Sequence, residues 1–227
     1  MLPKPVVERH EGVLVVRDDL LPGGTKRRVV SRLLHGGSEF VYASPACGYA
    51  QVALAHACRE AGYQATVFTA KRKCPHIRTM EAVSAGAKVV QVPCGYLSNV
   101  QAKAWAYARA VGAVLLPFGL DVPEMVEGLR ETAAVLSIEP SEVWTAAGSG
   151  VLSRSLQIAW PGAAFRAVAV GAEPLTGRAV LYRAPERFEQ DAKEVPPFPS
   201  CSNYDAKAWQ FVRRHAGPGA LFWNVAA

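Results

Sequence analysis

Lys26 is the residue of this sequence whose type and surroundings best suit covalent chemistry. An apolar run from Gly12 to Val16 predicts a strand, which is followed by two carboxylates, Asp18 and Asp19, and a Pro-Gly-Gly turn. Lys26 then opens a predicted helix, so its amine lies near helix-terminal N–H groups and glycine backbone that a ligand can approach. Partial burial there would lower the pKa of the ammonium group and leave the amine nucleophilic, as Schiff-base chemistry requires. The alternative is an exposed lysine in a basic first turn.

The residues around Lys26 resemble a known family. Arg-Asp-Asp-Leu, a short gap and Gly-Gly-Thr-Lys-Arg are similar to the lysine segment of the pyridoxal 5'-phosphate (PLP) enzymes of fold type II, the tryptophan synthase beta-like group. The most similar branch is 1-aminocyclopropane-1-carboxylate deaminase and D-cysteine desulfhydrase, with Arg-Asp-Asp-Leu … Gly-Gly-Asn-Lys-x-Arg-Lys. This sequence differs at Thr25 and at Arg27-Arg28, and it resembles a shortened member. The resemblance implies that PLP is the cofactor and that Lys26 is the internal aldimine lysine.

A Gly-Ser-Gly turn, Gly148-Ser149-Gly150, follows a predicted strand and precedes a predicted helix. Glycines let the backbone approach phosphate oxygens, and successive N–H groups and the helix dipole attract the anion. The turn resembles the family's Gly-Ser-Gly-Gly-Thr phosphate cradle, which implies that residues 148–150 bind the cofactor phosphate. Val151-Leu152 replaces Gly-Thr, and Ser149, Ser153 or Arg154 could supply the missing donors.

The third informative stretch is Tyr204-Asp205-Ala206-Lys207, which precedes a helix and the closing strand 220–224. It resembles the family's Tyr-Glu-Gly-Lys helix start, which implies that Tyr204 is an acid/base or nucleophile and that Asp205 pairs with the pyridine nitrogen. Asn224 falls where the family has a cofactor-binding His-x-Gly-Gly segment, without its glycines. Taken alone, the stretch also fits a helix N-terminus where Asp205 favours the dipole.

The loop from Ser44 to Tyr49 is the candidate for substrate binding. It leaves a predicted strand and opens a helix whose N–H groups could hold a carboxylate. In the family this loop reads Ser-Asn-x-x-Arg or Ser-Gly-Asn-Thr-Gly. Here Ser44, Cys47, Gly48 and Tyr49 are the expected substrate contacts, but the Asn is absent. The alternative is an ordinary strand-to-helix turn with Ser44 as N-cap.

Alternating strands and helices must position these residues. The strands that the pattern predicts are 12–16, 39–43, 65–69, 87–92, 113–116, 142–146, 165–170, 179–182 and 220–224. The predicted helices are 26–35, 47–61, 76–85, 98–110, 123–136, 150–159 and 204–215. The fold class is therefore α/β, with parallel sheets flanked by helices and ligands at the carboxyl ends of strands. That topology predicts one edge carrying Lys26 and residues 44–48, 94–96 and 148–150. We expect two lobes: 1–40 with 119–227 as the larger PLP-binding lobe, and 41–118 as a smaller inserted lobe.

Composition narrows the class of protein. Of 227 residues, 50% are hydrophobic and 19% charged, which is typical of a globular chain with a sizeable core. The five cysteines form no CxxC pair, so we expect a reduced, cytoplasmic protein with no metal site. No apolar run approaches the roughly 20 residues of a membrane span, so we expect none. The net charge of +6 and the cluster Lys71-Arg72-Lys73 permit a polyanionic partner, although a solvated basic face explains them as well.

Together these observations predict a PLP-dependent lyase or deaminase that acts at the α-carbon of a small amino-acid-like substrate; a homodimer is expected. One alternative is a PLP enzyme that acts on an amino-acid-modified base in nucleic acid. Another is a binding protein that has kept the fold without catalysis, which the lost glycines at 151–152 and 225–226 motivate.

Overall fold

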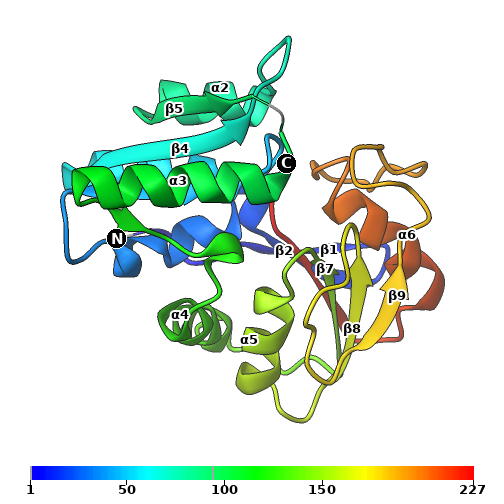
Figure 1. The fold of residues 1–227 in the computed structure, drawn as a ribbon. Helices are drawn as coiled ribbons and strands as arrows, with labels where there is room; N and C mark the ends of the chain where they lie inside the picture. Colours follow the sequence, from blue (N-terminus) through cyan, green and yellow to red (C-terminus); the bar gives the residue numbers. More distant parts are fainter. Residues whose placement is uncertain (1, 94) are drawn as a thin grey trace. The chain divides into compact units, whose positions relative to one another are not determined.

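Six strands of the computed structural model form one sheet in the order β1-β2-β10-β7-β8-β9 (Figure 1). The structure describes residues 2–93 and 95–227. β1 runs antiparallel to β2, and all other neighbouring strands are parallel. The strands span Val7–His10 (β1), Val13–Arg17 (β2), Ala220–Asn224 (β10), Glu142–Ala147 (β7), Ala164–Ala169 (β8) and Val180–Arg183 (β9).

Helices cover both faces of this sheet because its central strands are apolar on both sides. Trp144 and Phe222 face α6 (Asp205–His215), where Trp209 and Val212 complete the packing. Their strand neighbours point the other way, as the period of two requires. That second face packs against α4 (Pro123–Ala134) and α5 (Val151–Ala159), together with Trp160.

The second sheet has four parallel strands in the order β5-β4-β3-β6. They span Lys88–Val92 (β5), Gln64–Ala70 (β4), Glu39–Ala43 (β3) and Val114–Leu115 (β6). The helices are α1 (Ala50–Ala61), α2 (Ile77–Ser84) and α3 (Leu97–Val111). Figure 1 shows α3 lying along β4, and the small residues Ala104 and Ala108 allow this close packing against Val41 and Phe68.

The chain divides into two units. The larger unit holds the residues up to Thr25 together with Val126–Ala227, and the smaller unit is Lys26–Met125. The predicted insert 41–118 lies inside the smaller unit, and its borders as a functional lobe stay a prediction. No helix within the described residues is long and apolar enough to cross a membrane.

The α/β prediction with parallel, helix-covered sheets is confirmed, but the chain differs from the expected elements in two places. β1 was not expected because its residues, Val-Glu-Arg-His, show no apolar alternation; it pairs with β2 across a tight turn at Glu11 and Gly12, both with positive φ. The predicted helix 26–35 is wrong. Short 3₁₀ segments occupy this region, η2 (Thr25–Arg28) and η3 (Val30–Leu33), separated by Val29 with φ −121°. Two further 3₁₀ turns are η1 (Asp18–Leu20) and η4 (Phe118–Leu120).

Candidate functional site

Lys26 is the first residue of the smaller unit and lies in the 3₁₀ segment η2. Its side chain is half-buried. Burial lowers the pKa of Lys26 to about 8, and the negative charge of Asp121 opposes that shift only in part. The amine is therefore partly neutral, and nucleophilic, near physiological pH.

The residues after Lys26 attach η2 to the smaller unit. The guanidinium of Arg27 is buried and forms an ion pair with Glu60 near the end of α1. This pairing lowers the pKa of Glu60, first through the hydrogen bond from Arg27. Arg27, which departs from the family's pattern, thus has a structural partner in this chain.

The glycine before Lys26 serves a contact within the protein. Gly24 has φ +67°, and a Cβ added to it would lie 2.3 Å from the carbonyl oxygen of Val225. The amide of Thr25 donates to that same oxygen at 3.1 Å. A glycine is required at position 24 because the backbone here packs closely against the carbonyl of Val225, just after β10. This contact within the protein explains the glycine without a ligand; the approach of a ligand stays a prediction.

The Gly148–Gly150 turn connects β7 to α5 in the larger unit. Gly150 has φ +85°, and a Cβ there would lie 2.0 Å from the carbonyl oxygen of Leu175. Among the described residues, the amides of five consecutive residues have no hydrogen-bond acceptor: Ser149, Gly150, Val151, Leu152 and Ser153. Such a run of open N–H groups at a helix start is suited to an anion.

Two of the expected replacement donors are used elsewhere. Ser153 Oγ donates to the carbonyl of Thr176 at 3.3 Å, and Arg154 Nε donates to the carbonyl of Leu175 at 3.0 Å. Both side chains therefore fix the segment after β8 to α5. The backbone amides of this turn offer donors for an anion, and a contribution from the side chains of Ser149, Ser153 or Arg154 stays a prediction.

Tyr204 lies against the Gly148 turn. The amide of Gly148 donates to Tyr204 Oη at 2.8 Å, and a Cβ on Gly148 would lie 3.2 Å from that oxygen. Burial, followed by the charge of Asp205, raises the pKa of Tyr204 above its usual value. The phenol is therefore protonated at neutral pH.

Asp205 begins α6 and is fully buried. Its Oδ2 accepts from the amide of Ala226 at 3.2 Å, whereas its Oδ1 has no hydrogen-bond partner among the described residues. Burial raises the pKa of Asp205 well above its usual value; the amides of Val225 and Ala226 oppose the shift, and the charges of Asp19 and Asp18 add to it. A buried carboxyl with an open oxygen fits a ligand that brings an N–H group or a positive charge.

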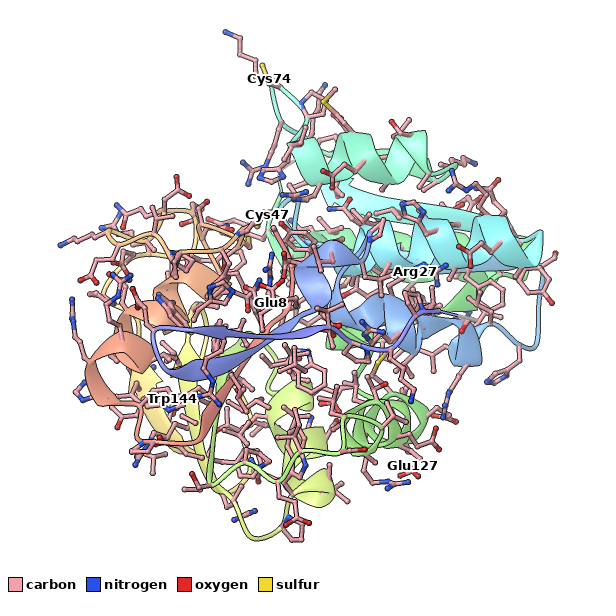
Figure 2. All side chains as sticks on the ribbon, turned by 180° about the vertical axis from the view of Figure 1, so that it is seen from behind. Glu8, Arg27, Cys47, Cys74, Glu127 and Trp144 are labelled. Carbon is pink, nitrogen blue, oxygen red and sulfur yellow. The ribbon has the colours of Figure 1, made fainter. Side chains whose placement is uncertain are left out.

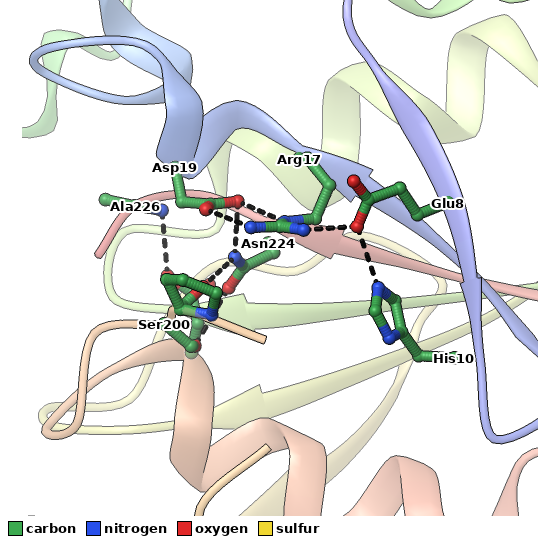
Figure 3. A network of polar contacts seen from close by, with 9 residues as sticks. Glu8, His10, Arg17, Asp19, Ser200, Asn224 and Ala226 are labelled. Atoms are coloured by element: carbon green, nitrogen blue, oxygen red, sulfur yellow. Dashed lines mark hydrogen bonds and ion pairs between the residues drawn. The ribbon is translucent and has the colours of Figure 1, made fainter. Parts of the chain in front are cut away.

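Asn224 belongs to a polar network at the carboxyl ends of β2 and β10 (Figure 3). Its Nδ2 donates to Asp19 Oδ1 at 2.7 Å and to the carbonyl of Pro199 at 2.9 Å. Its Oδ1 accepts from Ser200 Oγ at 2.8 Å. Both polar atoms of Asn224 thus contact protein groups, and its expected contact with the cofactor stays a prediction.

Arg17 continues this network toward β1. Its Nε and Nη2 donate to the two oxygens of Asp19, each at 2.8 Å, and it also pairs with Glu8, which lies 2.8 Å from His10 Nε2. The sequence alone assigns no role to Arg17, Asp18 and Asp19. The partners of Asp18 and Asp19, Trp223 and Asn224, each lie 205 residues away, so the match to the family's Arg-Asp-Asp segment was the one signal for this network.

The loop 44–49 belongs to the smaller unit and is held largely by nearby groups. Ser44 Oγ donates to the carbonyl of Pro45 at 2.9 Å, and Gln51 Nε2 donates to the carbonyls of three loop residues. The alternative with Ser44 as N-cap is wrong, because α1 begins at Ala50 with Tyr49 in the cap position and no side-chain cap bond.

The other expected substrate contacts lie along the same loop. Cys47 is half-buried (Figure 2). A Cβ on Gly48 would lie 2.9 Å from Ser44 Oγ, so this glycine allows the loop to close on Ser44. The Tyr49 ring lies under the guanidinium of Arg78, 4.4 Å from its centroid. Substrate binding by these residues stays a prediction.

The basic cluster Lys71-Arg72-Lys73 is exposed, in a loop that continues to the exposed Cys74 (Figure 2). This exposure fits both a solvated loop and a polyanion contact. Cys94, part of the predicted edge, lies outside the described residues. Within the larger unit the structure brings Gly148 and Tyr204 into contact and places both Asp205 and Thr25 against the end of β10.

The fold is similar to that of solved enzymes. No family model and no curated protein matches the sequence. Among solved structures, an ACC deaminase homologue matches with a TM-score of 0.85 at 13% identity, over 99% of this chain and 90% of that chain. O-ureido-L-serine synthase matches with a TM-score of 0.70 at 18% identity, over 98% and 88%. Diaminopropionate ammonia lyase from Escherichia coli matches with a TM-score of 0.69 at 12% identity, over 95% and 78%. The chain has the fold of the fold type II PLP enzymes, as predicted.

Proposed function

We propose that this chain is a PLP-dependent lyase or deaminase that acts at the α-carbon of an amino acid or amino-acid-like amine, with Lys26 as the amine that binds the cofactor. The observation that carries the proposal is a half-buried lysine, Lys26, directly after a Gly-Gly-Thr segment in a chain with the fold of the fold type II PLP enzymes. In support, burial lowers the pKa of Lys26 to about 8. At pH 8 about half of such amines are neutral, whereas an exposed lysine with a pKa of about 10.4 would be less than 1% neutral. Covalent chemistry at a carbonyl needs the neutral form.

The residues of the larger unit fit the remaining parts of the cofactor. The open amides of residues 149–153 fit a phosphate, since successive N–H groups at a helix start bind that anion. The open Oδ1 of buried Asp205 fits a ring nitrogen that carries a proton. The raised pKa of Asp205 supports this assignment, because a buried carboxyl without a cationic partner is poorly stabilised as an anion.

PLP, when bound, supplies an electron sink for a bond at the α-carbon of an amine. Asp205 would hold the proton on the ring nitrogen, and residues 148–150 would hold the phosphate. Lys26 would take the proton from the α-carbon at its Nζ, for which an amine with a pKa near 8 is well matched. Tyr204, protonated at neutral pH, would give a proton from its Oη rather than act as a nucleophile. Ser44, Cys47, Gly48 and Tyr49 would contact the substrate.

The proposal is tested by adding PLP, reducing with borohydride and mapping the cofactor mass to a peptide. We expect the mass on the peptide that contains Lys26 and the absorbance of the bound cofactor to disappear in Lys26→Ala. Lys103→Ala, which removes an exposed lysine of α3, is the matched control and should leave both unchanged. A label on another lysine, or an unchanged spectrum in Lys26→Ala, would overturn the assignment.

The alternative in which the amine is carried on nucleic acid is supported by the exposed Lys71-Arg72-Lys73 cluster and the charge of +6. Contacts to several phosphates would make the affinity for DNA or RNA fall steeply with salt, with a slope of about 0.9 per phosphate on a duplex. A free amino acid offers one carboxylate and should respond to salt only weakly. Titration at two salt concentrations, with Lys71→Glu/Lys73→Glu as the control, separates the two substrates.

A further inference from the structure

We propose that Trp223 is a positioning residue for Lys26: its indole N–H fixes Thr25, the residue to which Lys26 is bonded. Trp223 Nε1 lies 3.0 Å from Thr25 Oγ1 and 2.9 Å from Asp18 Oδ2, so one N–H is shared between two acceptors. This inference rests on the proposed role of Lys26.

The three side chains of this contact are buried in the larger unit. Trp223 and Asp18 are 0% exposed and Thr25 is 2% exposed. In a site without water, a donor between two oxygens sets the position of both more firmly than it could at the surface. The carboxylate of Asp18 makes the bond from the indole charge-assisted and therefore stronger.

The backbone of Thr25 is also bonded to the segment that follows β10. The amide of Thr25 donates to the carbonyl of Val225, and Gly24 leaves no room for a Cβ against that carbonyl. Thr25 is thus held from both its side chain and its main chain by consecutive residues at the end of β10. Because Lys26 follows Thr25 directly, the start of its backbone is fixed by this attachment.

The same end of β10 also holds the start of α6. The amide of Cys201 donates to the carbonyl of Ala226 at 2.8 Å, and the amide of Ala226 donates to Asp205. Residues 223–226 therefore contact both the residue before Lys26 and the segment that carries Tyr204 and Asp205. Within the larger unit this segment thus holds both Thr25 and the start of α6.

The test compares variants that remove one bond each. Trp223→Phe deletes the indole N–H, and Thr25→Val deletes its acceptor with little change in volume. Trp209→Phe is the matched control, because Trp209 is equally buried but its indole N–H has no hydrogen-bond partner among the described residues. For each protein the rate of borohydride-trapped PLP labelling at Lys26 is measured by peptide mapping. The cofactor-free protein is also methylated with formaldehyde and cyanoborohydride across pH, which reports the Lys26 amine without PLP.

We expect Trp223→Phe and Thr25→Val each to slow PLP labelling at Lys26 about tenfold, the scale of one lost hydrogen bond to a charged pair. Trp223→Phe/Thr25→Val should be no slower than Trp223→Phe, since both changes remove the same contact. The pH midpoint for methylation of Lys26 should rise toward about 10.4 in both single variants, as the amine becomes exposed. Trp209→Phe should match the wild type in both measurements.

Wild-type rates in Trp223→Phe and Thr25→Val, or an equal loss in Trp209→Phe, would overturn the positioning role. Should Trp223→Phe fail to fold by circular dichroism, Thr25→Val decides the question alone. Absence of PLP from Lys26 in the wild type would instead contradict the proposed function, and the methylation midpoints would still show whether Trp223 fixes the lysine.

Discussion

The loop before α1 and the loop before α5 share the order strand, turn and helix, yet they are held in different ways. Loop 44–49 is fixed chiefly from within: Gln51 Nε2 donates to three of its carbonyls, and Thr79 adds one bond from α2. Loop 148–150 is contacted from afar: Tyr204 Oη, 56 residues away, accepts from the amide of Gly148, and the carbonyl of Leu175 leaves no room for a Cβ on Gly150. A locally held loop can keep its shape while its surroundings change. A loop held from afar has its shape set by the elements that carry Tyr204 and Leu175.

The largest expected effect comes from Gly150, which leaves no room for a side chain against the carbonyl of Leu175. Gly150→Ala would place a Cβ 2.0 Å from the Leu175 carbonyl at φ +85°, so we expect a loss of about 3 kcal/mol or more in the free energy of unfolding. Gly148→Ala is the matched variant, because its Cβ would lie 3.2 Å from Tyr204 Oη, which a small ring movement relieves. Urea unfolding of both variants measures the difference, and equal losses would contradict the assigned contact.

Loop 44–49 should lose stability when the side-chain amide of Gln51 is removed. Gln51→Met keeps the volume but removes one buried side-chain donor from three carbonyls of loop 44–49, and we expect a loss of about 2 kcal/mol. Gln64→Met is the control, since the exposed Gln64 donates only to the carbonyl of its neighbour Ala65. Denaturant unfolding followed by hydrogen exchange at α1 would show whether the loss is local. A cost no larger than that of Gln64→Met would mean that the loop holds itself without Gln51.

The smallest expected effect concerns Asp205, whose pKa is raised in the folded protein. The folded protein keeps the proton on such a carboxyl to a higher pH than the unfolded chain does. The free energy of unfolding therefore falls as the pH rises above about 3.9, the pKa of an aspartate in the unfolded chain. Asp205→Asn removes this dependence and should stabilise the cofactor-free protein by about 1 kcal/mol at pH 8, but not at pH 4. The same variant should bind PLP more weakly.

Melting temperatures at the two pH values measure the effect of Asp205→Asn. Asp191→Asn, which alters an exposed carboxylate bonded to Ser202, should change stability little at either pH. If Asp205→Asn instead destabilises the cofactor-free protein at pH 8, the Asp205 carboxylate is stabilised by groups of the folded protein. That result would contradict its assignment as a carboxyl that lacks a cationic partner.

The sequence predicted those strands and turns that depend on patterns of neighbouring residues. The strands 39–43 and 220–224 were predicted with the bounds that the structure shows, because each is an apolar run beside glycine or proline turns. The Gly148 turn and Tyr204 were singled out separately, and the structure joins them by one hydrogen bond.

Contacts between residues far apart in the chain could not be predicted from the sequence. Trp223 meets Asp18 and Asn224 meets Asp19, each across 205 residues, and no local pattern ties such positions together. The contact between Gly24 and the carbonyl of Val225 likewise could not be predicted, since Val225 is near in space only. The predicted helix 26–35 fails where such a contact begins: Thr25, the first residue of η2, is bonded to the carbonyl of Val225.

The central claim, that Lys26 is a partly buried amine prepared for PLP, is tested most directly by following its labelling against pH. PLP and borohydride are applied across pH 6 to 11, and the Lys26 and Lys103 peptides are quantified in the same digest. We expect the Lys26 signal to rise with a midpoint near 8, because the neutral amine reacts and burial lowers the pKa of Lys26. The exposed Lys103 peptide controls for the efficiency of labelling. A Lys26 midpoint of about 10.4, the pKa of an unperturbed lysine, would contradict the account.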